Sequence, residues 1–426
     1  MLPIWNEHCK FIYDKCGLQL EEGYYWLDRQ IVKAFDKQGK IHKVYRLKTE
    51  NDLSMSYTTY KKEKFEIATW YDTQLLLNDR LNELENNSIK LLQEYGLNTD
   101  RTIIDTNSTG KDSEVKTHLA HKAGLKFDTY FNCTTMDVAD SNRFAKAKGY
   151  KFTYPEKKYG GFYQWQKREN IIPSRLNRVC CTYFKEGATM NEFDVGDKLL
   201  FLFGMRNDES NNRSGYEDVW INNKWGNKRD WVGILPIRKW TDLDIWLYIL
   251  REGIDINLKY KKGYDRVGCG IVCPNYTKTT WVLDQYWYPK LFNRWRNILE
   301  EDFINNNKWL IMNCTIEEYV QQAWNGGVFR SEPVEKVIQE YALHNDLDLG
   351  VAKKYFNRYC NNGCLNKRKN PMKIKDKNTL AMNMKLYGRQ IEKFQCKKCL
   401  MKEFEWTKED WNNKVAEFKE QGCKLF

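Results

Sequence analysis

Thr102-Ile-Ile-Asp-Thr-Asn-Ser-Thr-Gly-Lys-Asp-Ser113 is the stretch of sequence that decides the fold of this chain. Its first four residues form a short β-type run, and a helix pattern follows the loop as far as Gly124. A loop of short residues before a helix N-terminus turns backbone N–H groups and positive potential toward an anion. Lys111 adds a mobile charge, while Ser108 and Ser113 add hydroxyl donors. The stretch therefore predicts a phosphate or sulfate site, with an ordinary turn as the alternative; the GxxxxGK[ST] spacing of a Walker A loop is absent.

Strand and helix patterns alternate around this loop. Leucines near helical spacing predict an amphipathic helix over 73–95. Such alternation is typical of a parallel sheet with crossover helices, so we expect an α/β fold. The further expected strands are 127–131, 151–154, 198–203 and 232–237, and the further expected helices are 137–149 and 241–251.

The flanking regions differ in pattern from this α/β part. Short β-type runs at Ile31–Phe35 and His42–Leu47 predict a hairpin in a mixed N-terminal region. The C-terminal third is helical and aromatic-rich, with helices expected over 333–343 and from Thr407, where Asp410 completes a capping box. We expect four parts: 1–72 (mixed β), 73–280 (α/β), 281–350 (helical) and 351–426 (a helical, metal-binding module).

Composition and charge exclude several classes of protein. The 426 residues are 42% hydrophobic and 30% charged, which excludes a disordered chain. The longest apolar stretch, around Leu199 to Met205, falls far short of the ~20 residues that span a bilayer. The first residues lack the pattern of a secretory signal, so we expect a cytoplasmic protein with no membrane partner. The net charge of +12 suits anionic partners such as nucleotides, nucleic acids or sulfated metabolites, or serves solubility alone.

Three more motifs follow the loop in order. They are Arg178-Val-Cys-Cys181 with Lys185, Gly204-Met-Arg-Asn-Asp-Glu-Ser210 with Arg213, and Pro236-Ile-Arg-Lys-Trp240 with Asp244 and Trp246. Gly204 ends an apolar strand, and ligands bind at such strand ends in open α/β sheets. Arg206 and Arg213 offer bidentate anion-binding groups, and Glu209 could orient one of them. A surface loop of ion pairs is the alternative interpretation.

Together these segments resemble the phosphoadenosine phosphosulfate (PAPS) reductase family, within the PP-loop superfamily of adenine-nucleotide α-hydrolases. The resemblance covers about residues 73–280 and implies a Rossmann-like parallel sheet that binds ATP, adenylylsulfate or PAPS. It implies catalytic roles for Lys111, Arg206 and Arg213. Cys133-Thr-Thr-Met-Asp137 departs from the family's Asp-Thr-Gly after the second strand. The implied nucleotide-binding residues are Ser108, Thr109, Gly110, Lys111, Asp112, Ser113, Gly204, Arg206, Glu209 and Ser210.

The cysteines of the α/β part form a first set, namely Cys180, Cys181, Cys269 and Cys273. Four thiolates are what a [4Fe–4S] cluster needs. The set resembles that of the assimilatory adenylylsulfate reductases, although its second pair is CxxxC rather than CxxC. The resemblance therefore implies an iron–sulfur cluster and, with it, an electron-donor protein. Zinc, or a redox dithiol at Cys180 and Cys181, is the alternative.

A second set consists of Cys360-Asn-Asn-Gly-Cys364 and Cys396-Lys-Lys-Cys399. Two close pairs at this separation predict a structural zinc site, so we expect a zinc-ribbon-like module. Four unrelated reduced thiols are the alternative. Basic residues surround the set and could bind nucleic acid or the acidic face of a protein partner.

One further cysteine, Cys423, lies in the C-terminal tail. PAPS reductases carry a catalytic cysteine in such a tail, followed by glycine and histidine, which this chain lacks. Cys423 is thus either a nucleophile or a capping thiol.

Three functions fit these observations. The first is a sulfonucleotide reductase-like oxidoreductase of sulfur metabolism. The second is an ATP pyrophosphatase, a transferase that adenylates and thiolates a nucleic acid, as in tRNA thiolation or DNA phosphorothioation. The third is a non-catalytic nucleotide- or nucleic-acid-binding module, because a fold alone never establishes an activity.

Overall fold

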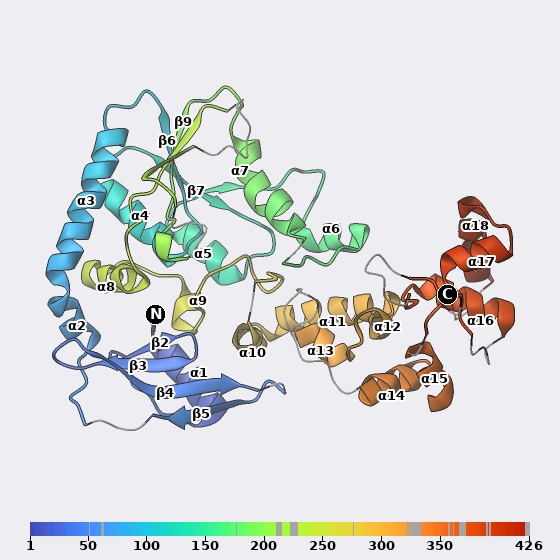
Figure 1. Cartoon of the computed structure of the whole chain (residues 1–426). Helices are drawn as coiled ribbons and strands as arrows, with labels where there is room; N and C mark the ends of the chain where they lie inside the picture. Colours follow the sequence, from blue (N-terminus) through green and yellow to red (C-terminus); the bar gives the residue numbers. More distant parts are fainter. Residues whose placement is uncertain are drawn as a thin grey trace. The chain divides into compact units, whose positions relative to one another are not determined.

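The chain divides into two compact units, Met1–Phe292 and Asn293–Phe426, and the boundary falls within helix α11 (Pro289–Asn305) (Figure 1). The four-part division expected from the sequence remains a prediction. This computed structural model describes residues 1–50, 52–60, 64–175, 177–209, 215–221, 229–275, 277–321, 324, 334–356, 358–360, 362–365, 372–388, 391 and 393–421.

The first sheet of the N-terminal unit is antiparallel, with five strands in the order β1-β2-β3-β4-β5. Strands β3 and β4 pair as the expected hairpin, so that prediction is confirmed. Helix α1 (Asn6–Cys16) packs on this sheet through Phe11 and Ile12, which are fully buried with Val32. The strands are β1 (Leu2–Pro3), β2 (Tyr25–Asp28), β3 (Ile31–Phe35), β4 (Ile41–Thr49) and β5 (Met55–Thr59).

The second sheet has the order β10-β11-β9-β6-β7-β8 and is parallel except at β10. The predicted parallel α/β sheet is thus confirmed. The antiparallel edge strand β10 was not expected from the sequence. The strands are β6 (Thr102–Thr106), β7 (Asp128–Asn132), β8 (Lys151–Thr153), β9 (Leu199–Leu202), β10 (Val219–Ile221) and β11 (Trp231–Ile234).

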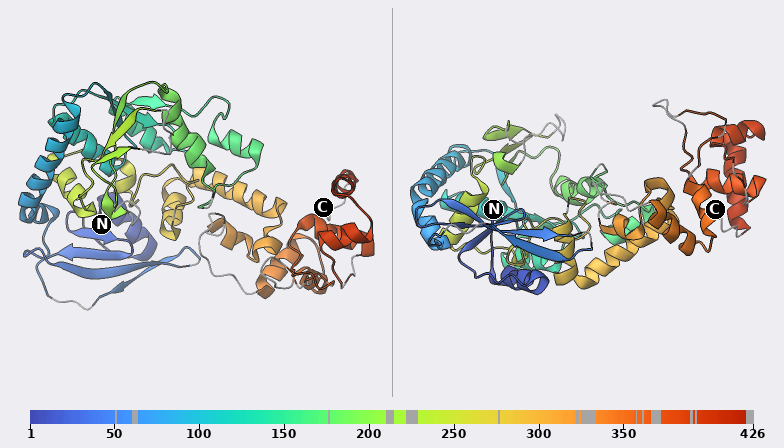
Figure 2. Two further views of the ribbon diagram at one scale, coloured as in Figure 1. Left: turned by 45° about the horizontal axis from the view of Figure 1, so that its top comes forward. Right: turned by 60° about the horizontal axis from the view of Figure 1, so that its bottom comes forward.

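Helices cover both faces of this sheet (Figures 1 and 2). Alternate residues of a strand point to opposite faces, so Ile103 and Ile104 enter two different cores. Ile103 packs with α3 (Asn78–Gly96), α4 (Lys111–Lys122) and α8 (Asp242–Glu252). Ile104 packs with Met190 of α7 (Gly187–Glu192). The other helical segments here are α5 (Ala139–Ala147), α6 (Phe162–Glu169), the π-helical η1 (Cys181–Glu186), the 3-10 turn η2 (Asn207–Glu209), α9 (Leu258–Lys261) and α10 (Lys278–Trp287).

The single helix predicted over 73–95 is wrong in one respect, because two helices stand there. Helix α2 (Trp70–Leu76) begins at a capping box formed by Thr69 and Asp72, and α3 begins after Leu77. Leu77 leaves helical geometry at φ −106°, ψ 11°. The leucine spacing continues across this break, which is why periodicity alone joined the two helices.

The C-terminal unit is helical among its described residues. The predicted helices over 333–343 and from Thr407 are confirmed as α14 and α18, and Thr407 and Asp410 form the expected capping box. Met382, Leu400, Trp411 and Val415 form a small core. The helices after α11 are α12 (Lys308–Met312), α13 (Ile316–Gln321), α14 (Val334–His344), α15 (Leu349–Phe356), α16 (Lys377–Tyr387), α17 (Lys397–Glu403) and α18 (Lys408–Glu420).

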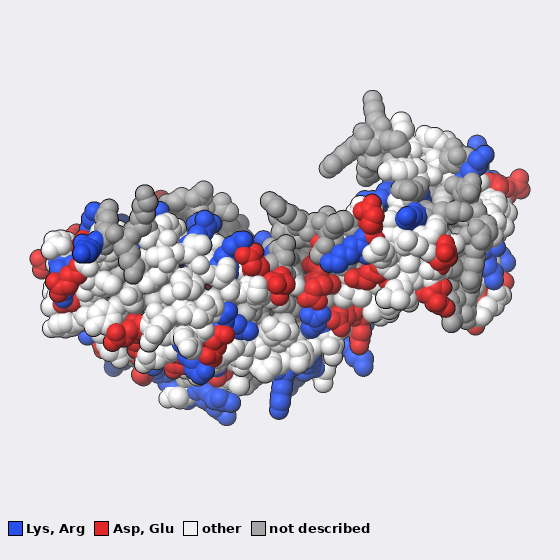
Figure 3. All heavy atoms as spheres, turned by 90° about the horizontal axis from the view of Figure 1, so that it is seen from below, with Lys and Arg blue, Asp and Glu red and all other residues white. Residues whose placement is uncertain are grey.

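Among the described residues, no helix is both long and apolar enough to span a bilayer. On the face shown in Figure 3, basic and acidic side chains are interspersed among uncharged residues.

Candidate functional site

The predicted anion loop connects the end of β6 to the N-terminus of α4, as the sequence indicated. Thr109 adopts the left-handed conformation at φ +58°, and its side chain is fully buried. Its backbone N–H donates to Asn107 Oδ1 at 2.7 Å, and its hydroxyl accepts from Asn257 Nδ2 at 2.9 Å. These bonds from both sides hold the loop in a conformation that a threonine rarely adopts unaided.

The first turn of α4 supplies the donors of the candidate site. The intrahelical hydrogen bonds begin with Glu114 N–H to Gly110 O, so the N–H groups of Asp112 and Ser113 have no intrahelical acceptor. The Lys111 N–H donates instead to the Tyr260 hydroxyl at 2.9 Å. The hydroxyl of the exposed Ser108 lies 3.1 Å from that of Ser113. Backbone amides at a helix N-terminus, with two hydroxyls beside them, can hold a phosphate or sulfate.

Gly204 allows the loop after β9 to approach this turn. A Cβ atom on Gly204 would lie 3.0 Å from Asp112 O and 3.2 Å from Ser113 N. Both contacts are to backbone, which cannot rotate aside as a side chain can. The absence of a side chain at Gly204 therefore sets the distance between the two loops.

Lys111 and Arg206, the two cations predicted to bind an anion, lie together, but each is already paired with carboxylates. Lys111 Nζ lies 2.8 Å from Asp112 Oδ2 and 3.1 Å from Asp242 Oδ1. Arg206 donates from Nε to Asp112 Oδ1 at 2.5 Å and from Nη2 to Asp242 Oδ1 at 2.9 Å. The amino group of Met1 also contacts Asp242, at 2.5 Å. The side chains of Lys111 and Arg206 are only 8% and 4% exposed.

The pairing fixes the charge of these groups. Burial acts to lower the pKa of Lys111, but the carboxylates of Asp112 and Asp242 outweigh it, and the pKa rises. Burial acts to raise the pKa of Asp242, but Lys111 and the other cations outweigh it, and the pKa falls. Lys111 and Asp242 therefore stay charged at neutral pH, and the bonds of the cluster tie the two loops together.

Other predicted residues of the second motif have mixed outcomes. Glu209 accepts from the backbone N–H of Arg206 through Oε2 at 3.1 Å, so it contacts the arginine it was expected to orient. Ser210 and Arg213 lie outside the described residues.

Polar residues that the sequence reasoning missed lie beneath the loop. Asp105 and Lys116 form a fully buried ion pair, and Asp105 also accepts from the Thr117 hydroxyl at 2.7 Å. Burial raises the pKa of Glu114 to about 7, and the Tyr150 hydroxyl lies 2.9 and 3.0 Å from its two carboxylate oxygens. The sequence did contain one indication of this buried polar cluster, because Asp105 is a charged residue within an otherwise apolar β-type run.

The first cysteine set comes together beside this sheet. The Cys180 and Cys181 side chains hydrogen-bond each other, and Cys269 and Cys273 are close enough to affect the pKa of Cys180. The hydrogen bond from Cys180, followed by the charge of Lys185, lowers the pKa of Cys181 to about 6. Lys185 is half-buried beside these thiols, and the negative charge of Cys269 raises the pKa of Lys185.

The first set consists of four cysteines, which are ligands of both zinc and iron–sulfur clusters. Its thiols are buried or half-buried, and the cation of Lys185 lies beside them. An iron–sulfur cluster at this set remains a prediction.

The cysteine loop is joined to the anion loop through α9. Gly270, between Cys269 and Cys273, has φ +82°, and a Cβ on it would lie 1.9 Å from Met136 O. The cysteine loop thus packs on the loop that follows β7. Lys259 of α9 is buried and donates to Val267 O at 2.6 Å. The next residue, Tyr260, contacts Lys111.

Residues 102–275 match the family model of the phosphoadenosine phosphosulfate reductase domain. The chain contains this domain. The PAPS reductase domain includes the anion loop, the Gly204 loop and all four cysteines of the first set. The resemblance seen in the sequence is thereby confirmed.

Proteins of differing description are similar to parts of this chain. An uncharacterised protein of Methanocaldococcus jannaschii is 29% identical over 241 residues, which make up 54% of this chain and 57% of the archaeal protein. A sulfate adenylyltransferase subunit 2 of Alkalilimnicola ehrlichii is 26% identical over 199 residues, 41% of this chain and 62% of its own. An adenosine 5′-phosphosulfate reductase of Salinibacter ruber is 27% identical over 104 residues, 24% of this chain and 38% of its own. The matches thus span less than two thirds of these relatives.

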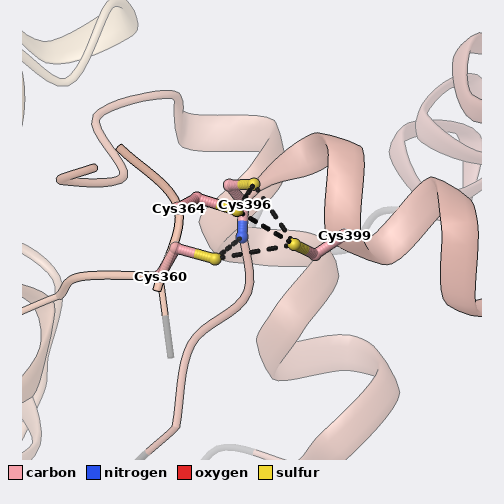
Figure 4. A group of neighbouring side chains, drawn as sticks. All are labelled: Cys360, Cys364, Cys396 and Cys399. Atoms are coloured by element: carbon pink, nitrogen blue, oxygen red, sulfur yellow. Dashed lines mark hydrogen bonds between the residues drawn. The ribbon is translucent and has the colours of Figure 1, made fainter. Parts of the chain in front are cut away.

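The second cysteine set lies outside the PAPS reductase domain. Its four ligand atoms lie within 4.8 Å of one another, a spacing at which they could hold a metal ion (Figure 4). Cys360 and Cys396 are buried, whereas Cys364 and Cys399 are half-buried. Cys423, the predicted tail nucleophile, lies outside the described residues.

Proposed function

We propose that the chain is a PP-loop enzyme that binds an adenine nucleotide and acts in sulfur chemistry as a sulfonucleotide reductase. The observation that carries the proposal is the joining of an anion loop to a set of four cysteines through α9. Tyr260 contacts Lys111 N, and Lys259 contacts Val267 O two residues before Cys269. Nucleotide phosphates and sulfur chemistry would then meet at the carboxyl edge of one parallel sheet.

The nucleotide would be held mainly by backbone donors. The N–H groups of Asp112 and Ser113 and the hydroxyls of Ser108 and Ser113 would contact phosphate or sulfate oxygens. Lys111 and Arg206 are paired with Asp112 and Asp242, so they would act as positioning residues that hold the two loops together. The catalytic roles that the family resemblance implies for Lys111, Arg206 and Arg213 remain predictions.

The reaction would proceed in two thiol steps. A thiolate forms a bond to the sulfur of adenylylsulfate or PAPS, the bond from sulfur to the phosphate oxygen breaks, and the nucleotide leaves. The first protein sulfur now carries the sulfonate group as a thiosulfonate. A second thiol attacks this protein sulfur, a disulfide forms between the two thiols, and sulfite leaves. The two thiols supply the two electrons and are regenerated by a reductant. Cys423 remains the candidate for the first thiol.

The first cysteine set would hold a [4Fe–4S] cluster through Cys180, Cys181, Cys269 and Cys273. When bound, such a cluster supplies redox or electrostatic chemistry beside the nucleotide. Lys185, half-buried beside these thiols, would offset their negative charge.

The test is a product assay on anaerobically purified protein. The protein is incubated separately with ATP, adenylylsulfate and PAPS plus a thiol reductant, and sulfite and pyrophosphate are measured. Sulfite from a sulfonucleotide is the expected result. The double variant Ser108→Ala, Ser113→Ala should lose most of this activity, while Ser56→Ala, on an exposed position of β5, should keep it. Pyrophosphate from ATP without sulfite would overturn the reductase assignment.

A second candidate function, thiolation of a nucleic acid, is favoured by one surface feature. A cavity of about 410 Å³ is lined by Lys158, Tyr159, Trp165, Arg168, Glu169, Ile171 and Tyr183. The rings of Tyr159 and Tyr183 stack with centroids 4.8 Å apart, and Tyr183 lies two residues after Cys181. Lys158 and Arg168 are 63% and 52% exposed, each beside a glutamate. Aromatic rings with neighbouring cations are typical of single-strand binding.

Binding of labelled single-stranded RNA or DNA, followed by fluorescence anisotropy at several salt concentrations, tests this candidate. The variant Tyr159→Ala should weaken binding about tenfold, in line with ~1–3 kcal/mol per stacked base. Tyr71→Ala, at an exposed tyrosine of α2, should not change it. Equal binding by both variants, or no binding by the wild type, would exclude this cavity as a nucleic-acid acceptor site.

A further inference from the structure

The second cysteine set carries an inference that is independent of the nucleotide site. We propose that Cys360, Cys364, Cys396 and Cys399 bind one structural Zn²⁺ ion, and that this ion holds the C-terminal module of residues 358–421 together.

The sulfur positions fit a single tetrahedral ion. Cys399 Sγ lies 3.7 Å from Cys360 Sγ, 3.4 Å from Cys364 Sγ and 3.6 Å from Cys396 Sγ. Cys396 Sγ lies 3.8 Å from Cys364 Sγ. A Zn–S bond of ~2.3 Å in a regular tetrahedron places neighbouring sulfurs about 3.8 Å apart. All four side chains point toward one common centre (Figure 4).

The same distances exclude other arrangements of these thiols. A disulfide requires an S–S distance of about 2.05 Å, far shorter than any of these. An iron–sulfur cluster needs a wider ring of ligands than one ion does. Four thiolates around one ion suit Zn²⁺ or a single iron ion. A given site generally binds Zn²⁺ more tightly than Fe²⁺. Four protein ligands leave no open position, which is typical of a structural rather than a catalytic site.

The backbone around the cysteines is organised as a metal site would require. Cys360 N donates to Met372 O at 2.9 Å, and Met372 N donates to Cys364 O at 2.8 Å, so backbone hydrogen bonds hold both cysteines of the first pair beside Met372. Cys396 caps the N-terminus of α17, and Cys399 lies in its first turn. Cys396 N also donates to Cys360 Sγ at 3.3 Å. A backbone donor to a ligand sulfur stabilises the thiolate form and orients it.

The described part of the module has a small apolar core. Met382, Leu400, Trp411 and Val415 pack together with partly buried neighbours, and Ile374, Leu380, Met384 and Phe394 are buried as well. Domains with so little apolar core usually need a metal or disulfides to fold. The ion would join residues 358–360, 362–365 and 372–374 to α17, and α16 lies between these two parts in the sequence.

The test uses the full-length protein, purified without added metal from medium containing both zinc and iron. Metal analysis should find one zinc per chain that resists dialysis and is released by a mercurial reagent. Replacing that zinc with Co²⁺ should give the absorption spectrum of tetrahedral tetrathiolate cobalt. This arm requires no variant to fold.

The variants locate the ion. Cys364→Ser with Cys399→Ser should lose the zinc and expose the module to rapid proteolysis after residue 356, while ATP-analogue binding and any iron persist. Cys314→Ala, at a buried free cysteine of the same unit, should keep the zinc. Zinc retained in the double variant, iron in place of zinc, or a cobalt spectrum lacking four thiolates would overturn the site. Zinc loss with unchanged proteolysis would overturn the structural role.

Discussion

Arg206 donates from Nε to Asp112 Oδ1 at 2.5 Å, and so ties the loop after β9 to the first turn of α4. The two residues are 94 positions apart in the chain and belong to motifs recognisable separately in the sequence. The ion pair explains why an arginine of the second motif is almost fully buried instead of exposed to an incoming anion. In the nucleotide site that we propose, backbone donors would bind the anion, and the charged cluster holds these donors in position.

The close approach of the two loops makes Gly204 testable. Gly204→Ala should lower affinity for adenylylsulfate at least tenfold in calorimetry, because the new Cβ would push against Asp112 O and Ser113 N. Its thermal unfolding should shift only modestly, since a local backbone displacement costs about 1–3 kcal/mol. Gly196→Ala, where a Cβ meets nothing within 4 Å, is the matched control. Undiminished affinity in the Gly204 variant would show that this approach does not shape the site.

The charged cluster should contribute to stability. Arg206→Met should lower the free energy of unfolding by about 2–4 kcal/mol, because it removes one of the buried cations that pair with Asp112 and Asp242 and leaves Lys111 to balance both carboxylates. The pKa of Asp242 is below its ordinary value, so its stabilisation is present at neutral pH and is lost as acid protonates it. The variant should accordingly show a shallower loss of stability on acidification. Denaturant melts at several pH values measure the free energy of unfolding and its dependence on pH. The control variant Arg143→Met, at an exposed arginine, should change neither quantity.

The buried Glu114 predicts a second pH dependence, of opposite sign. Burial raises its pKa from 4.5 to about 7, so the folded state binds more protons than the unfolded state between these values. Stability from this group is complete below pH 4.5 and is lost as pH rises through 7. Glu114→Gln should remove that slope and stabilise the protein by about 2 kcal/mol at pH 8. A slope left intact by Glu114→Gln, or altered equally by Glu94→Gln on the exposed face of α3, would refute the assignment.

The two cysteine sets should bind different metals. Cys269→Ser should remove iron and any brown colour from anaerobically purified protein, while one zinc per chain remains, because the two sets lie in different compact units. Cys133→Ser, a buried thiol whose pKa burial raises, should keep the iron. Metal analysis with visible absorption measures both. Loss of zinc with retention of iron in the Cys269 variant would reverse the assignment of the two sets.

Much of the fold followed from local patterns. The strand run at Thr102–Asp105, the helix after Gly110 and the capping box at Thr407 each depend on neighbouring residues, and all three are confirmed. Elements that depend on distant partners were missed. Strand β10 exists through its pairing with β11, and Leu77 interrupts a leucine pattern that sequence periodicity carries straight through. Periodicity records which face is apolar, not where the chain turns.

The sequence by itself determined the anion loop, the parallel sheet and the membership of both cysteine sets, since these depend on residue type and spacing. Only the tertiary structure decided how the charges are used. Lys111 and Arg206 meet Asp242 because β9 and α8 bring distant segments to the same edge of the sheet. Burial makes such pairing mandatory, because an unpaired charge out of water costs far more than a pair does. In the proposed site, the backbone of α4, rather than these two cations, would therefore receive the anion.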